Sequence, residues 1–192
     1  MKNLYDSPQI KVLGTLTIVD ANTGACVLKK TNAIHQQNLA LVIARALSNE
    51  PNGTVYQLCF GNGGTFLNSS NILNYRPPNI IGASDLYNET YHVIVDDQAV
   101  GVSPSNSVIP VASAPPAVST LVVVTAVLSA AEPAGQATTD NLTTDTTSPY
   151  LFDEIGLKSE DGLLLTHLVF SPIEKTANRT FLITYTLNIS VA

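Results

Sequence analysis

Charged residues are scarce in this sequence, and tryptophan is absent. Only 12% of the 192 residues are Asp, Glu, Lys or Arg, against about 25% in an average soluble domain. This scarcity argues against disorder, because disordered chains are charge-rich and poor in apolar residues, whereas 45% of this chain is apolar. A neutral surface is unusual for a free monomer, which relies on charge for solubility. We therefore expect other protein to cover much of the surface.

Basic residues are missing from the whole middle of the chain. No Lys or Arg occurs between Arg76 and Lys158, while residues 77–157 contain both Asp96-Asp97 and Asp153-Glu154. Nucleic-acid binding needs a basic stripe that displaces counterions from phosphates. The bases elsewhere are scattered apart from the pair Lys29-Lys30. We expect no nucleic-acid partner.

Long apolar runs and clustered cysteines are also missing. The N-terminus lacks the apolar core of a signal peptide, and no apolar run approaches the ~20 residues that span a bilayer. We expect a protein made in a cytosol with no membrane partner. Cys26 and Cys59 lie far apart in apolar surroundings, so we expect two buried thiols. A disulfide is the alternative, which a reducing cytosol disfavours.

Metal and cofactor motifs are not found. His35, His92 and His167 lie on different predicted elements without a nearby Cys or carboxylate cluster, so we expect no metal site. The glycine-rich run 61–64 follows a strand but lacks the Gly-Lys-Ser/Thr of a phosphate loop. We interpret it as a plain turn and expect no cofactor.

Catalytic patterns are equally weak. The adjacent acids Asp153-Glu154 and Asp96-Asp97 are expected on opposite faces of their strands, since neighbouring strand residues alternate. No serine lies in a Gly-x-Ser-x-Gly turn. Acids distant in sequence still leave a hydrolase open. We expect a protein that is not an enzyme.

Period-two hydrophobicity dominates what is present. Residues 181–191 alternate apolar and polar side chains over eleven positions, and residues 11–19 are apolar on both alternating faces. A helix with an apolar stripe is predicted over residues 33–48, with Asn32 as its N-cap. About eight strands and one helix, without a βαβ rhythm, favour a mainly β fold. We expect an antiparallel β-sandwich or barrel-like domain with one amphipathic helix packed on it.

The whole chain, 1–192, is expected to form a single β-rich domain with two irregular segments. Residues 98–118 contain four prolines and are predicted to be an extended Pro-rich loop or arm, because such spacing forbids helix and central strand alike. Residues 133–149 are threonine-rich and are predicted to be a polar loop.

Two segments are candidate interaction sites. Tyr and Arg are enriched at interface hot spots, and here they stand beside two prolines, although a stiff surface loop is an equal alternative. The 98–118 segment has more Val and Ile than a free linker needs, which favours an arm that lies over a neighbouring subunit. The candidate interaction residues are Tyr75, Arg76, Pro77, Pro78, Val108, Ile109 and Val111.

Several ordered motifs resemble those of a known protein group. They are Phe152-Asp153-Glu154-Ile155-Gly156-Leu157, then Asp161-Gly162-Leu163-Leu164-Leu165, then Val169-Phe170-Ser171-Pro172-Ile173-Glu174-Lys175-Thr176, preceded upstream by the helix over 38–47 and the run 58–65. Together they resemble small structural proteins of tailed-bacteriophage virions, of the tail-fibre-like, neck and baseplate kind. The likeness covers roughly residues 33–65 and 120–190, whereas the hairpin over residues 10–30 and the Pro-rich segment depart from it.

The resemblance implies a non-enzymatic component of a tailed-phage virion, made in the host bacterial cytoplasm. It would assemble in multiple copies in the tail, neck, baseplate or fibre-attachment region, with other virion proteins and copies of itself as partners. A capsid decoration protein is the alternative on the same observations. A carbohydrate-binding β-sandwich is a third hypothesis, weakened by the few aromatic residues, 7 Tyr and 5 Phe.

Overall fold

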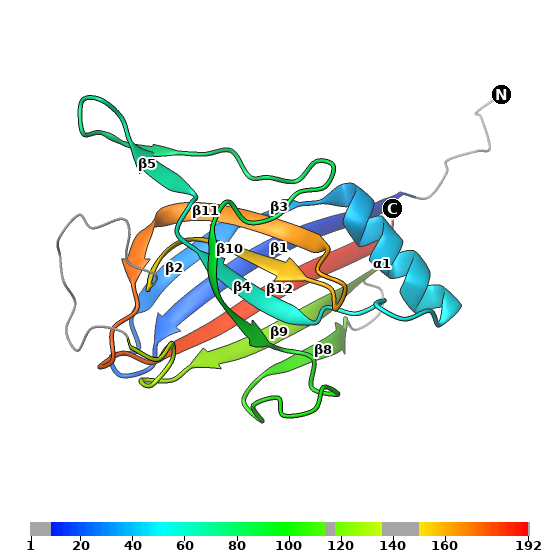
Figure 1. Ribbon diagram of the computed structural model, residues 1–192. Helices are drawn as coiled ribbons and strands as arrows, with labels where there is room; N and C mark the ends of the chain where they lie inside the picture. Colours follow the sequence, from blue (N-terminus) through cyan, green and yellow to red (C-terminus); the bar gives the residue numbers. More distant parts are fainter. Residues whose placement is uncertain (1–8, 114–117, 136–149, 192) are drawn as a thin grey trace.

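Two large antiparallel sheets, a small hairpin and one helix make up the part of the chain that the structure describes (Figure 1). The structure, a computed structural model, describes residues 9–113, 118–135 and 150–191. The first sheet, here the long-stranded sheet, has the order β2-β1-β12-β9-β8. Its strands are β1 (Ile10–Asp20), β2 (Cys26–Thr31), β8 (Ser107–Ala112), β9 (Ser119–Leu128) and β12 (Phe181–Val191).

The second sheet, here the central sheet, has the order β3-β11-β10-β4-β7. It is built from β3 (Ala33–Ile34), β4 (Gln57–Gly61), β7 (Glu89–Ile94), β10 (Leu151–Lys158) and β11 (Leu164–Glu174). A separate hairpin pairs β5 (Thr65–Leu67) with β6 (Leu73–Tyr75). The two sheets and the single helix confirm the predicted mainly β, antiparallel sandwich class.

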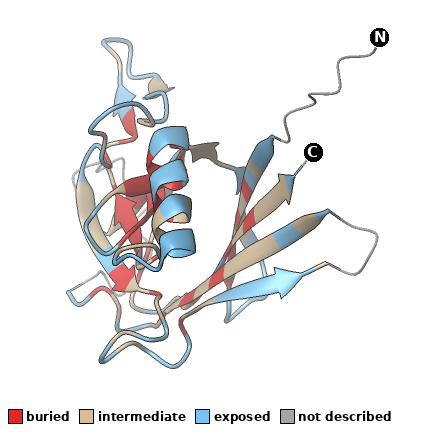
Figure 2. Cartoon of the chain, turned by 90° about the vertical axis from the view of Figure 1, so that its right-hand side faces the viewer, coloured by how far each residue is buried: buried red, intermediate tan, exposed pale blue. Residues whose placement is uncertain are grey.

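The main core lies between the two sheets. Alternate residues of β1, β12 and β9 point into it, as the strand period requires, and the register places Leu16, Tyr185 and Val124 side by side, all fully buried. Phe60 and Ile155 of the central sheet close the core from the opposite side. Figure 2 colours the buried residues, which lie on strands of both sheets. The alternation seen in the sequence is therefore the signature of this one-sided burial.

The central sheet is buried on both of its faces. Strand β10 is buried at seven consecutive positions, Phe152 to Lys158. A second small cluster of Cys59, Leu86 and Leu164 fills its far face beneath the loops. Helix α1 (Gln36–Ser48) packs at one end of this sheet, next to β11. Such burial explains why β10 and β11 carry almost no alternation in their sequence.

The helix is shorter than predicted. It begins after His35, whose Nδ1 accepts the N–H of Asn38 at 3.2 Å, so His35 and not Asn32 is the N-cap. The preceding pair Ala33–Ile34 is taken into the central sheet as β3, because a strand partner was available on β11. Of the predicted apolar stripe, Leu39 and Val42 are buried, whereas Leu47 is 84% exposed.

Two other predictions are corrected. Residues 107–112, expected in a loop or arm, form β8 at the edge of the long-stranded sheet, where Pro110 is tolerated because an edge strand has one unpaired side. Cys26 is exposed, unlike the buried Cys59, because it lies on the edge strand β2. Most of the predicted 133–149 loop, residues 136–149, lies outside the described residues.

Candidate functional site

The β5–β6 hairpin projects from the central sheet at the top of the molecule in Figure 1. It follows the glycine-rich run that ends β4, and the chain then continues as a long loop over residues 76–88 before β7. Hairpin and loop contain Tyr75, Arg76, Pro77 and Pro78, four of the predicted interaction residues. Buried carboxylates of the central sheet fix both segments.

A β-bulge in the pairing of β10 with β11 places two acids on the same face. Phe152 and Ile155 both belong to the core between the sheets, although they are three residues apart. The register shifts between Phe152 and Glu154, so Asp153 and Glu154 both project from the far face. The expectation that these adjacent acids point to opposite faces was therefore wrong.

Asp153 binds the start of the hairpin. Its Oδ1 accepts the N–H of Gly64 at 2.8 Å, and its Oδ2 accepts the N–H of Thr65 at 2.8 Å and the Thr65 hydroxyl at 2.5 Å. Gly64 lies so close that a Cβ there would stand 2.9 Å from the Asp153 carbonyl oxygen and from Val169 Cγ1. The glycine is thus required for close approach.

Glu154 binds both segments at once. Its Oε1 accepts the N–H groups of Gly63 at 3.1 Å and Asn88 at 2.7 Å, and its Oε2 accepts that of Tyr87 at 2.9 Å. His167 Nε2 lies 2.9 Å from the same Oε2. The amides of the glycine-rich run therefore point at the chain's own carboxylates, which agrees with a structural turn and leaves these amides without a free anion site.

Two buried histidines hold the loop over residues 76–88. His167 Nδ1 accepts the N–H of Asn79 at 2.7 Å, so its proton is on Nε2, facing Glu154. His35 likewise accepts a backbone N–H at Nδ1, and its Nε2 donates to the Gly82 carbonyl at 3.0 Å. In each ring both nitrogens are used in hydrogen bonds within the chain.

The two carboxylates respond oppositely to their surroundings. Burial raises the pKa of Asp153, and its hydrogen bonds from Thr65 and Gly64 do not fully compensate. Burial also acts to raise the pKa of Glu154, but hydrogen bonds from His167 and three backbone amides outweigh it and lower the pKa. Glu154 pairs with His167, while Lys175 Nζ donates to the Ser129 carbonyl at 2.9 Å.

Aromatic rings and cations gather on this fixed platform. The Arg76 guanidinium lies 5.5 Å from the Phe66 ring centre and 5.1 Å from that of Tyr87, and Lys30 Nζ lies 5.9 Å from that of Tyr75. Phe66, Tyr75 and Tyr87 are the exposed Phe and Tyr side chains of the described residues. We call these five residues the hairpin patch; their types are those of interface hot spots.

A cavity of about 420 Å³ opens beside the hairpin patch. Lys30 and Arg76 reach it from segments far apart in sequence, and Tyr75, Pro78 and Val169 add apolar wall. Six ion pairs join the described residues, and neither Lys30 nor Arg76 takes part in them. The cavity therefore presents two cations together with apolar surface.

The remaining predicted residues are not brought to this site. Val108, Ile109 and Val111 lie on β8 at the edge of the long-stranded sheet. Val108 packs against the core, whereas Ile109 and Val111 are 44% and 40% exposed on the opposite face. The two predicted segments thus mark two separate surfaces.

The outer face of the long-stranded sheet is nearly free of charge. Residues paired with or alternating with the buried ones face outward, and along β1, β12, β9 and β8 Lys11 is the one charged residue among them. On the edge strand β2, exposed Lys29 pairs with outward-facing Thr17 and adds a second charge. The other outward positions are neutral: Leu13, Thr15, Thr17, Val19, Leu182, Thr184, Thr186, Asn188, Ser190, Ser119, Leu121, Val123, Thr125, Val127, Ser107, Ile109 and Val111.

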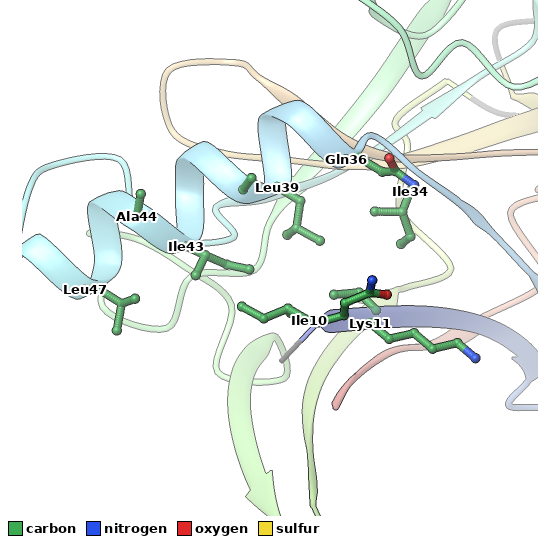
Figure 3. Close-up of a pocket in the computed structure, with 11 residues that line it drawn as sticks. Ile10, Lys11, Ile34, Gln36, Leu39, Ile43, Ala44 and Leu47 are labelled. Atoms are coloured by element: carbon green, nitrogen blue, oxygen red, sulfur yellow. The ribbon is translucent and has the colours of Figure 1, made fainter. Parts of the chain in front are cut away.

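An apolar groove of about 570 Å³ lies between α1 and the start of β1. Figure 3 shows Leu39, Ile43 and Leu47 of the helix facing Ile10 across it, with Ile34 at one end. Lys11 is the charged residue of its lining. Ile43 and Leu47, apolar residues of the helix that are not buried in the core, form part of one wall of this groove.

Sequence reasoning missed Lys30, Phe66 and Tyr87 as members of the hairpin patch. Each is remote from Arg76 or separated from it by a turn, and no local pattern connects them. One sequence signal did mark Arg76 itself, because Arg76 is the last basic residue before the stretch that contains no Lys or Arg. The anchoring roles of Asp153 and Glu154 depend on a bulge that the sequence does not announce.

No group of three potential metal-binding side chains occurs within residues 9–113, 118–135 and 150–191. In the same ranges, no helix has the length and hydropathy needed to cross a membrane. Comparison with protein-family models, with curated proteins and with solved structures finds no match. The function must therefore be argued from the surfaces themselves.

Proposed function

We propose that this chain is a non-enzymatic structural component of a tailed-phage virion. It assembles in multiple copies, in the tail, neck, baseplate or fibre-attachment region, with copies of itself and with other virion proteins. The motif resemblance of residues 152–176 supports the virion assignment. The assembly part of the proposal depends on a physical feature of the surface.

The observation that carries the proposal is the neutral outer face of the long-stranded sheet. Four adjacent strands present Thr, Val, Leu, Ile, Asn and Ser there, with Lys11 at one end. Depletion of charge is the compositional signal of an interface core, whereas a solvated face of this extent normally carries mixed charges. A neighbouring protein on this face accounts for the low charge of the whole chain.

The buried network of the central sheet supports a structural role for its acids and histidines. Four buried residues make hydrogen bonds to backbone groups of the chain itself: Asp153, Glu154, His35 and His167. Groups used in this way are not available to a substrate. The titratable residues that attracted attention in the sequence thus act as internal anchors.

Mass spectrometry of purified particles tests the proposal. Peptides of this chain should be present at a multi-copy ratio to a known virion protein, and labelling with an antibody should place the chain on the tail, neck or baseplate. Absence from intact particles would overturn the proposal. Labelling confined to the head would favour the capsid decoration alternative.

A carbohydrate-binding module is a second candidate, favoured by one observation. Phe66, Tyr75 and Tyr87 gather around Arg76 on the hairpin patch, and exposed aromatic rings are the usual platform for sugars. A glycan array with the wild-type chain, repeated with Tyr75→Ala, tests this candidate. A signal that the substitution abolishes would support it, and an empty array would remove it.

A further inference from the structure

The cavity beside the hairpin patch points to a ligand that is both acidic and apolar. Lys30 Nζ uses one N–H on the Val169 carbonyl at 2.9 Å and has two more to donate. The Arg76 side chain lies between the rings of Phe66 and Tyr87, and its backbone N–H is held by the Gly64 carbonyl at 2.8 Å. Both cations are thus positioned in advance, which lowers the entropy cost of binding.

An acidic and apolar segment lies at the other end of the same molecule. The loop after β7 contains Asp96, Asp97 and Val100, and Val100 is fully exposed. Figures 1 and 2 both show the hairpin at the top and the loop between β7 and β8 at the bottom. Asp97 is exposed, and the 81 residues from 77 to 157 contain no base to neutralise it locally.

The loop is also held in a defined shape. Asp96 Oδ1 accepts the N–H of Gln98 at 3.0 Å, and the Asp96 N–H donates to the Tyr56 carbonyl at 3.2 Å. Asn106 closes the segment, donating to the Ile94 carbonyl at 2.9 Å and accepting the N–H of Val127 at 3.0 Å. An exposed valine on such a constrained loop is well placed to pack against an apolar surface.

We propose that copies of this chain associate head to tail, with the Asp97–Val100 loop of one copy seated in the Lys30–Arg76 cavity of the next. Asp97 faces the two cations, and Val100 packs against Tyr75 and Pro78. This contact joins two different surfaces, so it generates a ring or a filament and not an isolated pair. The proposal rests on the multi-copy assembly proposed above and names one of its interfaces.

Reversing one charge on each side tests the contact. Arg76→Glu and Asp97→Lys are each expected to weaken self-association of the full chain about tenfold, the scale of a 1.4 kcal/mol loss. An equimolar mixture of the two variants is expected to recover association, since Asp97→Lys keeps a wild-type cavity and Arg76→Glu a wild-type loop. Sedimentation velocity over a concentration series measures this.

Glu160→Lys is the matched control, because it makes the same charge change at another exposed acid and should associate like the wild type. A disulfide cross-link tests which residues meet. One variant combines Cys26→Ser with Tyr75→Cys, the other combines Cys26→Ser with Val100→Cys, and we expect the two to form a cross-linked product when mixed. Replacing Val100→Cys by Glu160→Cys should abolish that product. Circular dichroism verifies that each variant is folded.

Three results would overturn the inference. They are wild-type chain that stays monomeric, variants that associate like the wild type, or a mixture that does not recover. Loss of a glycan-array signal in Arg76→Glu with unchanged self-association would assign the cavity to an acidic sugar instead. Each of these leaves the virion assignment standing if the chain is found in particles, and absence from particles rejects that assignment separately.

Discussion

The two sheets of this protein are stabilised in different ways. The long-stranded sheet has one apolar face and one neutral face, and its regular register runs without interruption over eleven pairs between β1 and β12. The central sheet is buried on both faces, contains bulges, and holds the buried acids Asp153 and Glu154 beside the buried His167. The first is a regular scaffold, whereas the second is a polar anchor for loops.

This difference shows which interactions determine the positions of the exposed segments. The apolar core between the sheets supplies non-directional stability. The hydrogen bonds of Asp153 and Glu154 are directional, and they determine where the hairpin and the loop over residues 76–88 lie. Apart from Lys30 on β2, the hairpin patch is consequently displayed from segments that these hydrogen bonds fix.

Removing the central anchor should have the largest effect. Glu154→Ala leaves three backbone N–H groups and the Nε2 proton of His167 buried without an acceptor. We expect a loss of about 3–5 kcal/mol in the free energy of unfolding, measured by urea denaturation. Asp97→Ala, at an exposed acid, should change it by no more than about 0.5 kcal/mol. Equal losses in both variants would contradict the anchor role.

The long-stranded sheet should respond through packing alone. Leu187 is 1% exposed in the core between the sheets. Leu187→Ala should cost about 2–5 kcal/mol by leaving a cavity. Amide hydrogen exchange should show this loss spread over β1, β12 and β9, whereas Glu154→Ala should loosen residues 63–65 and 76–88 first. Identical exchange patterns would remove the distinction between the sheets.

The close approach at Gly64 offers a milder test of the central sheet. Gly64→Ala places a Cβ 2.9 Å from both the Asp153 carbonyl oxygen and Val169 Cγ1. We expect a loss of about 1–3 kcal/mol from overpacking. The same variant should weaken any binding by the hairpin patch, because Arg76 is tied to the Gly64 carbonyl. A variant as stable as the wild type would show that the strand gives way freely.

Acid should destabilise the central sheet through Glu154. The pKa of Glu154 lies below the ordinary value of 4.5 in the folded protein, so its contribution is complete above 4.5 and is lost as the pH falls through the folded-state value. Asp153, whose pKa is raised, contributes with the opposite sign. The free energy of unfolding, measured with urea from neutral to acidic pH, should therefore fall less steeply in Glu154→Gln than in the wild type.

The smallest effect on stability is expected on the outer face of the long-stranded sheet. Thr186 is adjacent to Leu187 but faces outward, so Thr186→Lys should change the free energy of unfolding by about 0.5 kcal/mol or less. Because a charge in an interface core is costly, the same substitution should reduce incorporation into particles. Normal incorporation, judged by quantitative mass spectrometry, would contradict a neighbour on this face.

The elements of this fold also differ in how well the sequence predicts them. Strand β12 was predicted at its observed bounds, residues 181–191, because one-sided burial imprints a period of two. Strand β8 was missed because prolines mask an edge strand, and the hairpin β5–β6 because its strands are three residues long. The candidate patch was half found, since Tyr75 and Arg76 are adjacent in sequence while Lys30 and Tyr87 are brought in by the fold.

The sequence by itself determined the fold class, the long strands and the neutral composition that suits contact with other proteins. These properties are local or additive, so each residue contributes to them independently of its neighbours in space. The tertiary structure alone decided the helix start at His35, the bulge that turns Asp153 and Glu154 to one face, and the meeting of Lys30 with Arg76. Those features depend on which backbone amides, rings and strands are near in space, and chain order does not encode that proximity.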